Sequence, residues 1–182
     1  MIGFITVRTK STRLPNKCLL SFGDSTVLNH VIRRALFYSI DPIVCTSSLK
    51  EDDVIEEIAN KENVRCYRGS LNNKLQRWLD CATYFGVDRF HTIDADDPFF
   101  DGNEMIGSMK MLQDKGIDMI SPTKSSSSGG ASVGYSLTTD IVKRACDGLD
   151  NDSDTEMMWY FIEKVSNLRA KTLPETRKNI TK

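Results

Sequence analysis

A cluster of basic side chains follows the first apolar segment of this 182-residue chain. Residues 8–17 hold four cations interleaved with hydroxyl groups, namely Arg8, Lys10, Arg13 and Lys17. Recognition of a polyphosphate requires guanidinium groups, ammonium groups and backbone N–H donors gathered in one place. The run contains no glycine, so it is neither a Walker A loop nor a dinucleotide-binding fingerprint. Two interpretations stay open, a phosphate-binding loop and a solvated basic loop.

Residues 94–97 form a second run that could take part in chemistry, because three carboxylates occur there within four positions. Carboxylates this close repel one another unless a cation or a basic partner lies among them. Proteins hold Mg²⁺ through one or two carboxylates together with phosphate oxygens and water. The run therefore suits a magnesium site. The alternative is an acidic turn before a helix that Asp101 caps.

The overall composition excludes several classes of function. Lys and Arg number 24 against 25 Asp and Glu, so the net charge of −1 does not suit bulk binding of nucleic acid or of an anionic membrane surface. Five cysteines without a CxxC pair predict neither a disulfide framework nor a zinc site. No apolar stretch approaches the ~18 residues that span a bilayer. We expect a cytoplasmic protein.

Short apolar runs rich in β-branched residues alternate with segments of helical periodicity. We expect strands at residues 2–7, 43–46, 64–67, 90–93, 118–121, 131–137 and 168–173. We expect helices at residues 25–36, 51–61, 72–85, 101–115, 138–146 and 155–165. This alternation predicts βαβ units and a mostly parallel sheet, whose ligands bind at the carboxyl ends of the strands. The Ser/Gly-rich run 124–130 is either a mobile loop over a site or an inert connector.

The basic run also resembles a known signature. The signature loop of the cytidylyltransferase family is similar to the pattern Arg8-x-x-Ser11-x-Arg13-Leu14-Pro15-x-Lys17-x-Leu19. That family includes CMP-Kdo synthetases, CMP-sialic acid synthetases and spore-coat polysaccharide proteins. Four further motifs resemble the family in the same order, at residues 27–35, 43–55, 64–70 and 94–98. The resemblance covers roughly residues 2–115.

The resemblance implies a Rossmann-like three-layer α/β/α sandwich and a role for each matching residue. Arg8, Arg13 and Lys17 would hold the phosphates, with help from Ser11. Thr46 and Ser47 would lie beside the nucleoside, with Arg68 at the edge of the cytosine. Asp96 would hold Mg²⁺ against the phosphate oxygens, and Asp94 is the candidate for a second carboxylate at the metal.

The activity that the resemblance implies is transfer of CMP from CTP to an acidic sugar, such as Kdo, a sialic acid or a related nonulosonic acid. A sugar hydroxyl would attack the α-phosphorus and expel pyrophosphate, in the synthesis of a cell-surface glycan. No protein nucleophile is required, because catalysis rests on alignment and charge neutralisation. The expected partners are CTP, the sugar, and a second copy of the chain contacting the C-terminal half.

The sequence departs from the family at its end. Family members continue into an acidic segment that carries a second metal-binding Asp, whereas this chain ends at residues 178–182. We expect one domain, residues 1–182, that lacks this segment. Two alternative functions stay open. One is a transferase of the same fold that uses another nucleotide or a phosphonate acceptor, and the other is a non-catalytic nucleotide-binding or assembly module.

Overall fold

One sheet organises the chain in a computed structural model that describes residues 1–10, 14–123 and 133–175. The order of its seven strands in these ranges is β5-β4-β1-β6-β8-β7-β9. Their bounds are β1 Ile2–Thr6, β4 Asp41–Ser47, β5 Arg65–Gly69, β6 Arg89–Asp94, β7 Met119–Ser121, β8 Ser136–Thr138 and β9 Ala170–Thr172. Within this sheet only β8 runs antiparallel to its neighbours, and the other strand pairs described in it are parallel. The predicted mostly parallel sheet is confirmed.

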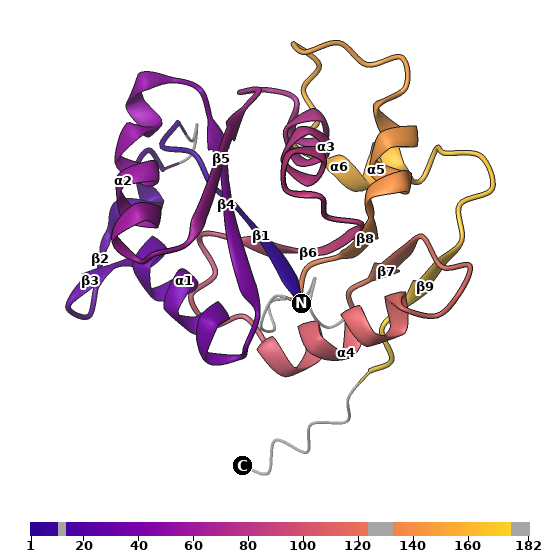
Figure 1. Cartoon of the computed structure of the whole chain (residues 1–182), viewed down its shortest axis with the longest axis horizontal. Coiled ribbons are helices and arrows are strands. Elements are labelled where there is room, and N and C mark those ends of the chain that lie inside the picture. The colour runs from indigo at the N-terminus through magenta and orange to yellow at the C-terminus, as the bar shows by residue number, and fades with distance from the viewer. Residues whose placement is uncertain (11–13, 124–132, 176–182) are drawn as a thin grey trace.

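Helices cover both faces of this sheet (Figure 1). One layer consists of α1 (Val27–Phe37), α2 (Asp53–Lys61) and α4 (Gly102–Leu112), which share one hydrophobic core. The opposite layer consists of α3 (Lys74–Phe85), α5 (Thr139–Cys146) and α6 (Met158–Ile162), which share another. The α/β/α sandwich predicted from the sequence is therefore confirmed. None of the helices described is long and apolar enough to cross a membrane.

Strand β1 lies at the centre of the sheet and must be packed closely on both sides. Phe4 is fully buried and its ring stacks on Phe90, with the ring centroids 4.0 Å apart. A Cβ on Gly3 would lie only 2.7 Å from Ile40 Cγ2 and 2.8 Å from Ile93 Cδ1, so glycine is required where these side chains approach the strand. The centre of the sheet thus leaves little freedom in the position where β1 ends.

The chain's path creates a natural ligand position at that end. From β1 it moves outward through β4 to β5, and then returns to β6 on the other side of β1. Ligands of open α/β sheets bind at such a reversal of strand order, outside the carboxyl ends of the strands. The basic run follows β1 and the acidic run closes β6, so both lie at this point.

Several predicted boundaries differ from those in the structure. The N-cap of α1 is Thr26, not Ser25, because Ser25 belongs to a hairpin formed by β2 (Ser21–Phe22) and β3 (Ser25–Thr26). The helix predicted at 155–165 is only α6, and the strand predicted at 131–137 is the short β8. The start of α2 is preceded by a 3₁₀ turn, Lys50–Asp52. Residues 124–130 lie outside the described ranges.

His91 on β6 is the most buried titratable ring in the described structure. Its Nε2 donates to the Val133 carbonyl, so its Nδ1 accepts from the Ser136 hydroxyl, 2.7 Å away. Desolvation by burial lowers the pKa of His91 from 6.5 to about 4. Gly134 permits this packing, because its φ is +75° and a Cβ there would lie 2.1 Å from the Thr92 carbonyl oxygen.

We predict that His91 makes the free energy of unfolding depend on pH between about 6.5 and 4. Above pH 6.5 the His91 ring is neutral in both the folded and the unfolded state. Below pH 6.5 the ring is protonated in the unfolded chain but stays neutral in the folded chain. The folded state should lose up to about 3 kcal/mol as the pH falls through this window. Urea denaturation at pH 7, 6, 5 and 4.5 measures this, and His91→Gln should flatten the dependence. An equal slope in that variant would contradict the assignment.

Candidate active site

A pocket of about 420 Å³ opens at the carboxyl ends of β1 and β6, beside the start of α3. Charged side chains dominate its lining, and they come from four separate parts of the chain. They are Arg8, Lys10, Lys17, Lys74, Arg77, Asp94, Asp96, Asp154 and Glu156. The structure therefore brings the basic run and the acidic run of the sequence to one cavity.

Lys17 and Asp96 meet across this pocket, where the Lys17 ammonium donates to Asp96 Oδ2 in an ion pair. The loop that carries Lys17 is closed by a hydrogen bond from the Asn16 backbone N–H to the Thr9 carbonyl, 2.9 Å long. Asn16 adopts a left-handed conformation, φ 58°, directly before the 3₁₀ turn Lys17–Leu19. This closed turn aims the ammonium back toward the end of β6.

A buried carboxylate anchors the start of the same loop. Asp52, 1% exposed, accepts hydrogen bonds from the Thr9 backbone N–H at 2.8 Å and the Thr9 hydroxyl at 2.7 Å. It also accepts from the backbone N–H and the hydroxyl of Ser47 at the end of β4. Burial alone would raise the pKa of Asp52, but the bonds from Ser47 and Thr9 together lower it. Asp52 thus joins the basic loop to the neighbouring strand.

Asp94 and Asp96 are the carboxylates that could hold a metal ion in this pocket. Asp94 lines the pocket, and the surrounding protein partly desolvates its carboxyl, which raises the pKa of that group. The nearby carboxylates of Asp96 and Glu156 raise it further, while Lys74 and Lys17 oppose them. No group of three or more His, Cys, Asp or Glu within the described ranges could by itself hold a metal. Two carboxylates still fit Mg²⁺, which completes its coordination with phosphate oxygens and water.

Three residues predicted to contact the nucleoside do not line the pocket in this structure. Thr46 and Ser47 are fully buried, and the Ser47 hydroxyl turns inward to Asp52. Arg68 lies 2.7 Å from a carboxylate oxygen of Asp53 and 2.9 Å from one of Glu56, and its Nε donates to the Ser47 carbonyl. Ser47 and Arg68 thus join β4 and β5 to the start of α2. The assignment of all three residues to the nucleoside stays a prediction.

Other predicted site residues fall into two groups. Arg8, Lys17, Asp94 and Asp96 all line the pocket. Ser11 and Arg13 lie outside the residues that the structure describes, so their placement stays a prediction. Lys10 also lines the pocket.

Four further charged residues of the lining were not among the site residues assigned from the sequence. Lys74 and Arg77 lie on the first turn of α3, and Asp154 and Glu156 precede α6. Lys74 and Arg77 carried a usable signal, since their helix follows the carboxyl end of a predicted strand. The pairing of Glu156 with Arg8 carried none, because the two residues are 148 positions apart along the chain.

A charged pocket at the strand-order reversal of a mostly parallel sheet is the ligand site expected of an open α/β protein. The sequence profile of the cytidylyltransferase family matches residues 2–170, and the chain belongs to this family. It is 36% identical over 100 residues to the uncharacterized protein MJ1063 of Methanocaldococcus jannaschii, covering 54% of this chain and 41% of that protein. It is 29% identical over 124 residues to the spore coat polysaccharide biosynthesis protein SpsF of Bacillus subtilis, covering 65% and 52%. The chain thus spans about half the length of the curated relatives it matches.

Solved structures agree with the family assignment. A cytidylyltransferase from Leptospira borgpetersenii superposes with a TM-score of 0.84 at 25% identity, over 98% of this chain and 76% of that one. A CMP:2-keto-3-deoxy-manno-octonic acid synthetase complexed with CTP superposes with a TM-score of 0.73 at 13% identity, over 96% and 90%. At that identity the second likeness shows the shared fold alone.

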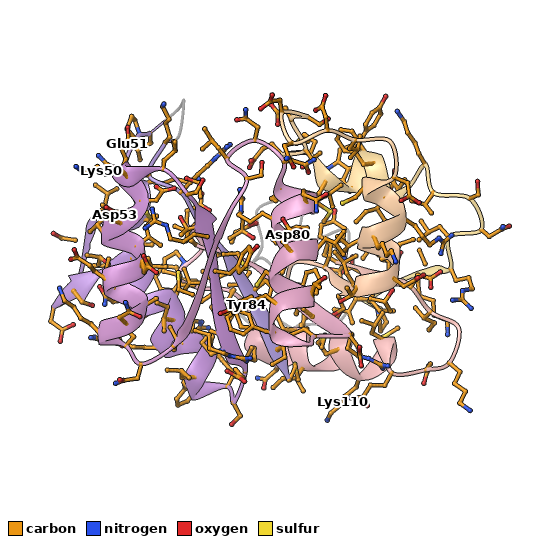
Figure 2. The ribbon with its side chains drawn as sticks, turned by 45° about the horizontal axis from the view of Figure 1, so that its top comes forward. Lys50, Glu51, Asp53, Asp80, Tyr84 and Lys110 are labelled. Atoms are coloured by element: carbon orange, nitrogen blue, oxygen red, sulfur yellow. The ribbon has the colours of Figure 1, made fainter. Side chains whose placement is uncertain are left out.

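We predict that Asp52→Asn lowers the free energy of unfolding by about 2–4 kcal/mol, because it weakens several buried hydrogen bonds to a charged acceptor. Asp53→Asn is the matched control. Asp53 lies with Lys50 and Glu51 at the outer start of α2 (Figure 2), and its side chain is 51% exposed. Its loss should cost less than about 1 kcal/mol. Urea denaturation at pH 7 compares the two, and equal losses would contradict an anchoring role for Asp52.

Proposed function

We propose that the protein binds CTP and transfers CMP to a hydroxyl of an acidic sugar, releasing pyrophosphate. The observation that carries the proposal is the convergence of Arg8 and Lys17 with Asp94 and Asp96 in one pocket at the strand ends. This arrangement places cations for the phosphates beside carboxylates suited to a divalent metal. Membership of the cytidylyltransferase family supports CTP as the nucleotide.

The likenesses to named proteins support a sugar acceptor. SpsF is named for the biosynthesis of spore coat polysaccharide, and the synthetase of similar fold is named for an octonic sugar acid. The acidic sugar is therefore our proposed acceptor class, and its product would serve in a cell-surface polysaccharide. We assign the reaction to the cytoplasm as part of the same proposal.

Each pocket residue has a role in this proposal that follows from its charge. Arg8 and Lys17 neutralise the triphosphate and hold it in line with the acceptor hydroxyl. Asp94 and Asp96 would hold Mg²⁺, which supplies positive charge to the phosphate oxygens. The acceptor oxygen bonds to the α-phosphorus while the bond from that phosphorus to the bridging oxygen breaks. Pyrophosphate leaves with the electron pair, and water takes the hydroxyl proton.

We predict that Lys17→Met and Asp96→Asn each reduce pyrophosphate release from CTP at least about 100-fold, the size expected when an oriented charge is removed from a phosphoryl transition state. The assay supplies CTP, Mg²⁺ and a panel of sugar acids, including Kdo and sialic acid. Lys110→Met is the control, because Lys110 projects from α4 into solvent and does not line the pocket (Figure 2). Full activity in both pocket variants would contradict the proposal.

We predict that CTP with Mg²⁺ raises the melting temperature more than UTP, GTP or ATP does, since a ligand that binds only the native state stabilises it according to its affinity. Removing the metal with EDTA should abolish most of the shift, because the phosphates then lose their bridge to Asp94 and Asp96. A larger shift with another nucleotide would favour the alternative transferase. A CTP shift without pyrophosphate release from any acceptor would favour the non-catalytic module.

The C-terminal half supports the proposed homodimer. Met158 and Ile162 of α6 are buried in the protein's own core, whereas Met157, Trp159 and Tyr160 are at least 36% exposed. Exposed apolar side chains grouped on one short segment are typical of an interface. Sedimentation equilibrium of the wild type and of Tyr160→Glu tests the proposal, and an unchanged mass would count against this surface.

A further inference from the structure

Three cations converge on the wall of the pocket at the first turn of α3. Arg8 and Arg77 both donate through Nη1 to the carbonyl of Leu71, at 3.0 and 3.3 Å. Lys74 is the first residue of α3 and shares this wall with them. Desolvation by burial is the largest cause that lowers the pKa of Lys74 and of Arg77. The charges of Arg77 and Arg8 lower the pKa of Lys74 further, and the charge of Arg8 lowers that of Arg77.

Among the described residues, one carboxylate forms ion pairs with this cluster, while Asp94 acts on Lys74 at longer range. Glu156 Oε2 lies 2.9 Å from Arg8 Nη2, and Glu156 Oε1 lies 3.7 Å from Lys74 Nζ. Within the described ranges, no other carboxylate lies within 4.0 Å of Arg8 or Lys74, and none lies that close to Arg77. The Nε of Arg77 is buried and has no hydrogen-bond partner among the described residues. The cluster therefore retains an excess of positive charge and an unused donor.

The backbone that carries Glu156 is held by buried hydrogen bonds of its neighbour, while the Glu156 side chain itself is largely exposed. Thr155, fully buried, accepts a hydrogen bond from the Leu75 backbone N–H at 3.0 Å and donates to the Asn73 side chain at 3.1 Å. These bonds attach the segment before α6 to the start of α3. The Glu156 side chain, in contrast, is 56% exposed, whereas that of Lys74 is 12% exposed. Glu156 can rotate away without disturbing the fold around Thr155.

We propose that Arg8, Lys74 and Arg77 form an oxyanion subsite, and that the carboxylate of Glu156 occupies it until an oxyanion of the substrate takes its place. The Glu156 side chain is largely exposed, so water can hydrate its carboxylate when it leaves, whereas Lys74 is largely buried and needs another anion in its place. A phosphate or carboxylate that carries its own binding contacts elsewhere in the pocket can therefore displace Glu156. The subsite deepens the proposed function and rests on it for the identity of the substrate.

Two parts of the proposed reactants share the required chemistry. A phosphate group of CTP and the carboxylate of the sugar acid are both oxyanions that suit a guanidinium and an ammonium group. Titrations with separate probes distinguish them. CTP with Mg²⁺ and inorganic pyrophosphate report a phosphate, and sialic acid in the presence of CMP reports a carboxylate.

The test compares variants that remove the two sides of the ion pair in the full chain. Glu156→Gln should lower the dissociation constant of the responding probe at least about threefold, because it frees the subsite. Lys74→Met should raise that constant at least about tenfold, because it removes a ligand, and Lys74→Arg should restore most of the affinity. Isothermal titration calorimetry measures all four proteins, with Lys110→Met as the control for a lysine outside the pocket.

The proposal predicts that the dissociation constant falls in Glu156→Gln and rises in Lys74→Met. In a purely structural ion pair, both substitutions would weaken binding. Binding by Glu156→Gln that is unchanged or weaker with every probe would overturn the subsite, provided that its melting temperature shows a folded protein. Glu156→Asp, which shortens the carboxylate's reach to Lys74, should lie between the wild type and Glu156→Gln. Wild-type protein that binds pyrophosphate but not CTP would refute the proposed nucleotide and leave the subsite supported by the pyrophosphate titrations.

Discussion

Parallel pairing of β1 with β6 is the constraint on which the rest of this structure depends. Thr6 at the end of β1 lies opposite Asp94 at the end of β6, so both strands stop at the same level of the sheet. The residues that follow them, separated by 79 positions between Lys17 and Asp96, then meet across one pocket. A ladder of backbone hydrogen bonds thus fixes where opposite charges come together, because strands in register must end in register.

Charge is concentrated at this edge, and the fold controls it with fixed dipoles and ion pairs. Asp52 holds the first turn of the basic loop through four donors from Thr9 and Ser47. Lys17 compensates Asp96, and Glu156 compensates Arg8 and Lys74. The paired cations are thereby held near the positions where phosphate charge would be needed, and binding of an anion exchanges one partner for another.

Structural features that depend on residues near one another in the chain could be predicted from the sequence. The strand and helix alternation predicted the layers, and local caps such as Asn73 and Asp101 set helix starts within about two residues. The short β8 and α6 were mispredicted as longer elements, since tertiary packing rather than periodicity decides where such segments end. The strand pattern also did not reveal that the Ser47 hydroxyl turns inward to the buried carboxylate of Asp52, because the pattern shows burial and not the partner of a hydroxyl.

The sequence by itself determined the class of fold, the family, and the two charged runs that the strands deliver to the pocket. These follow from periodicity and from motifs, both of which depend on neighbours within a few positions. Only the tertiary structure decided that Arg68 joins β5 to α2 instead of facing the pocket, and that Glu156 lies between Arg8 and Lys74. Such pairings join residues far apart in the chain, and no local pattern encodes them, since they exist only after the layers have packed.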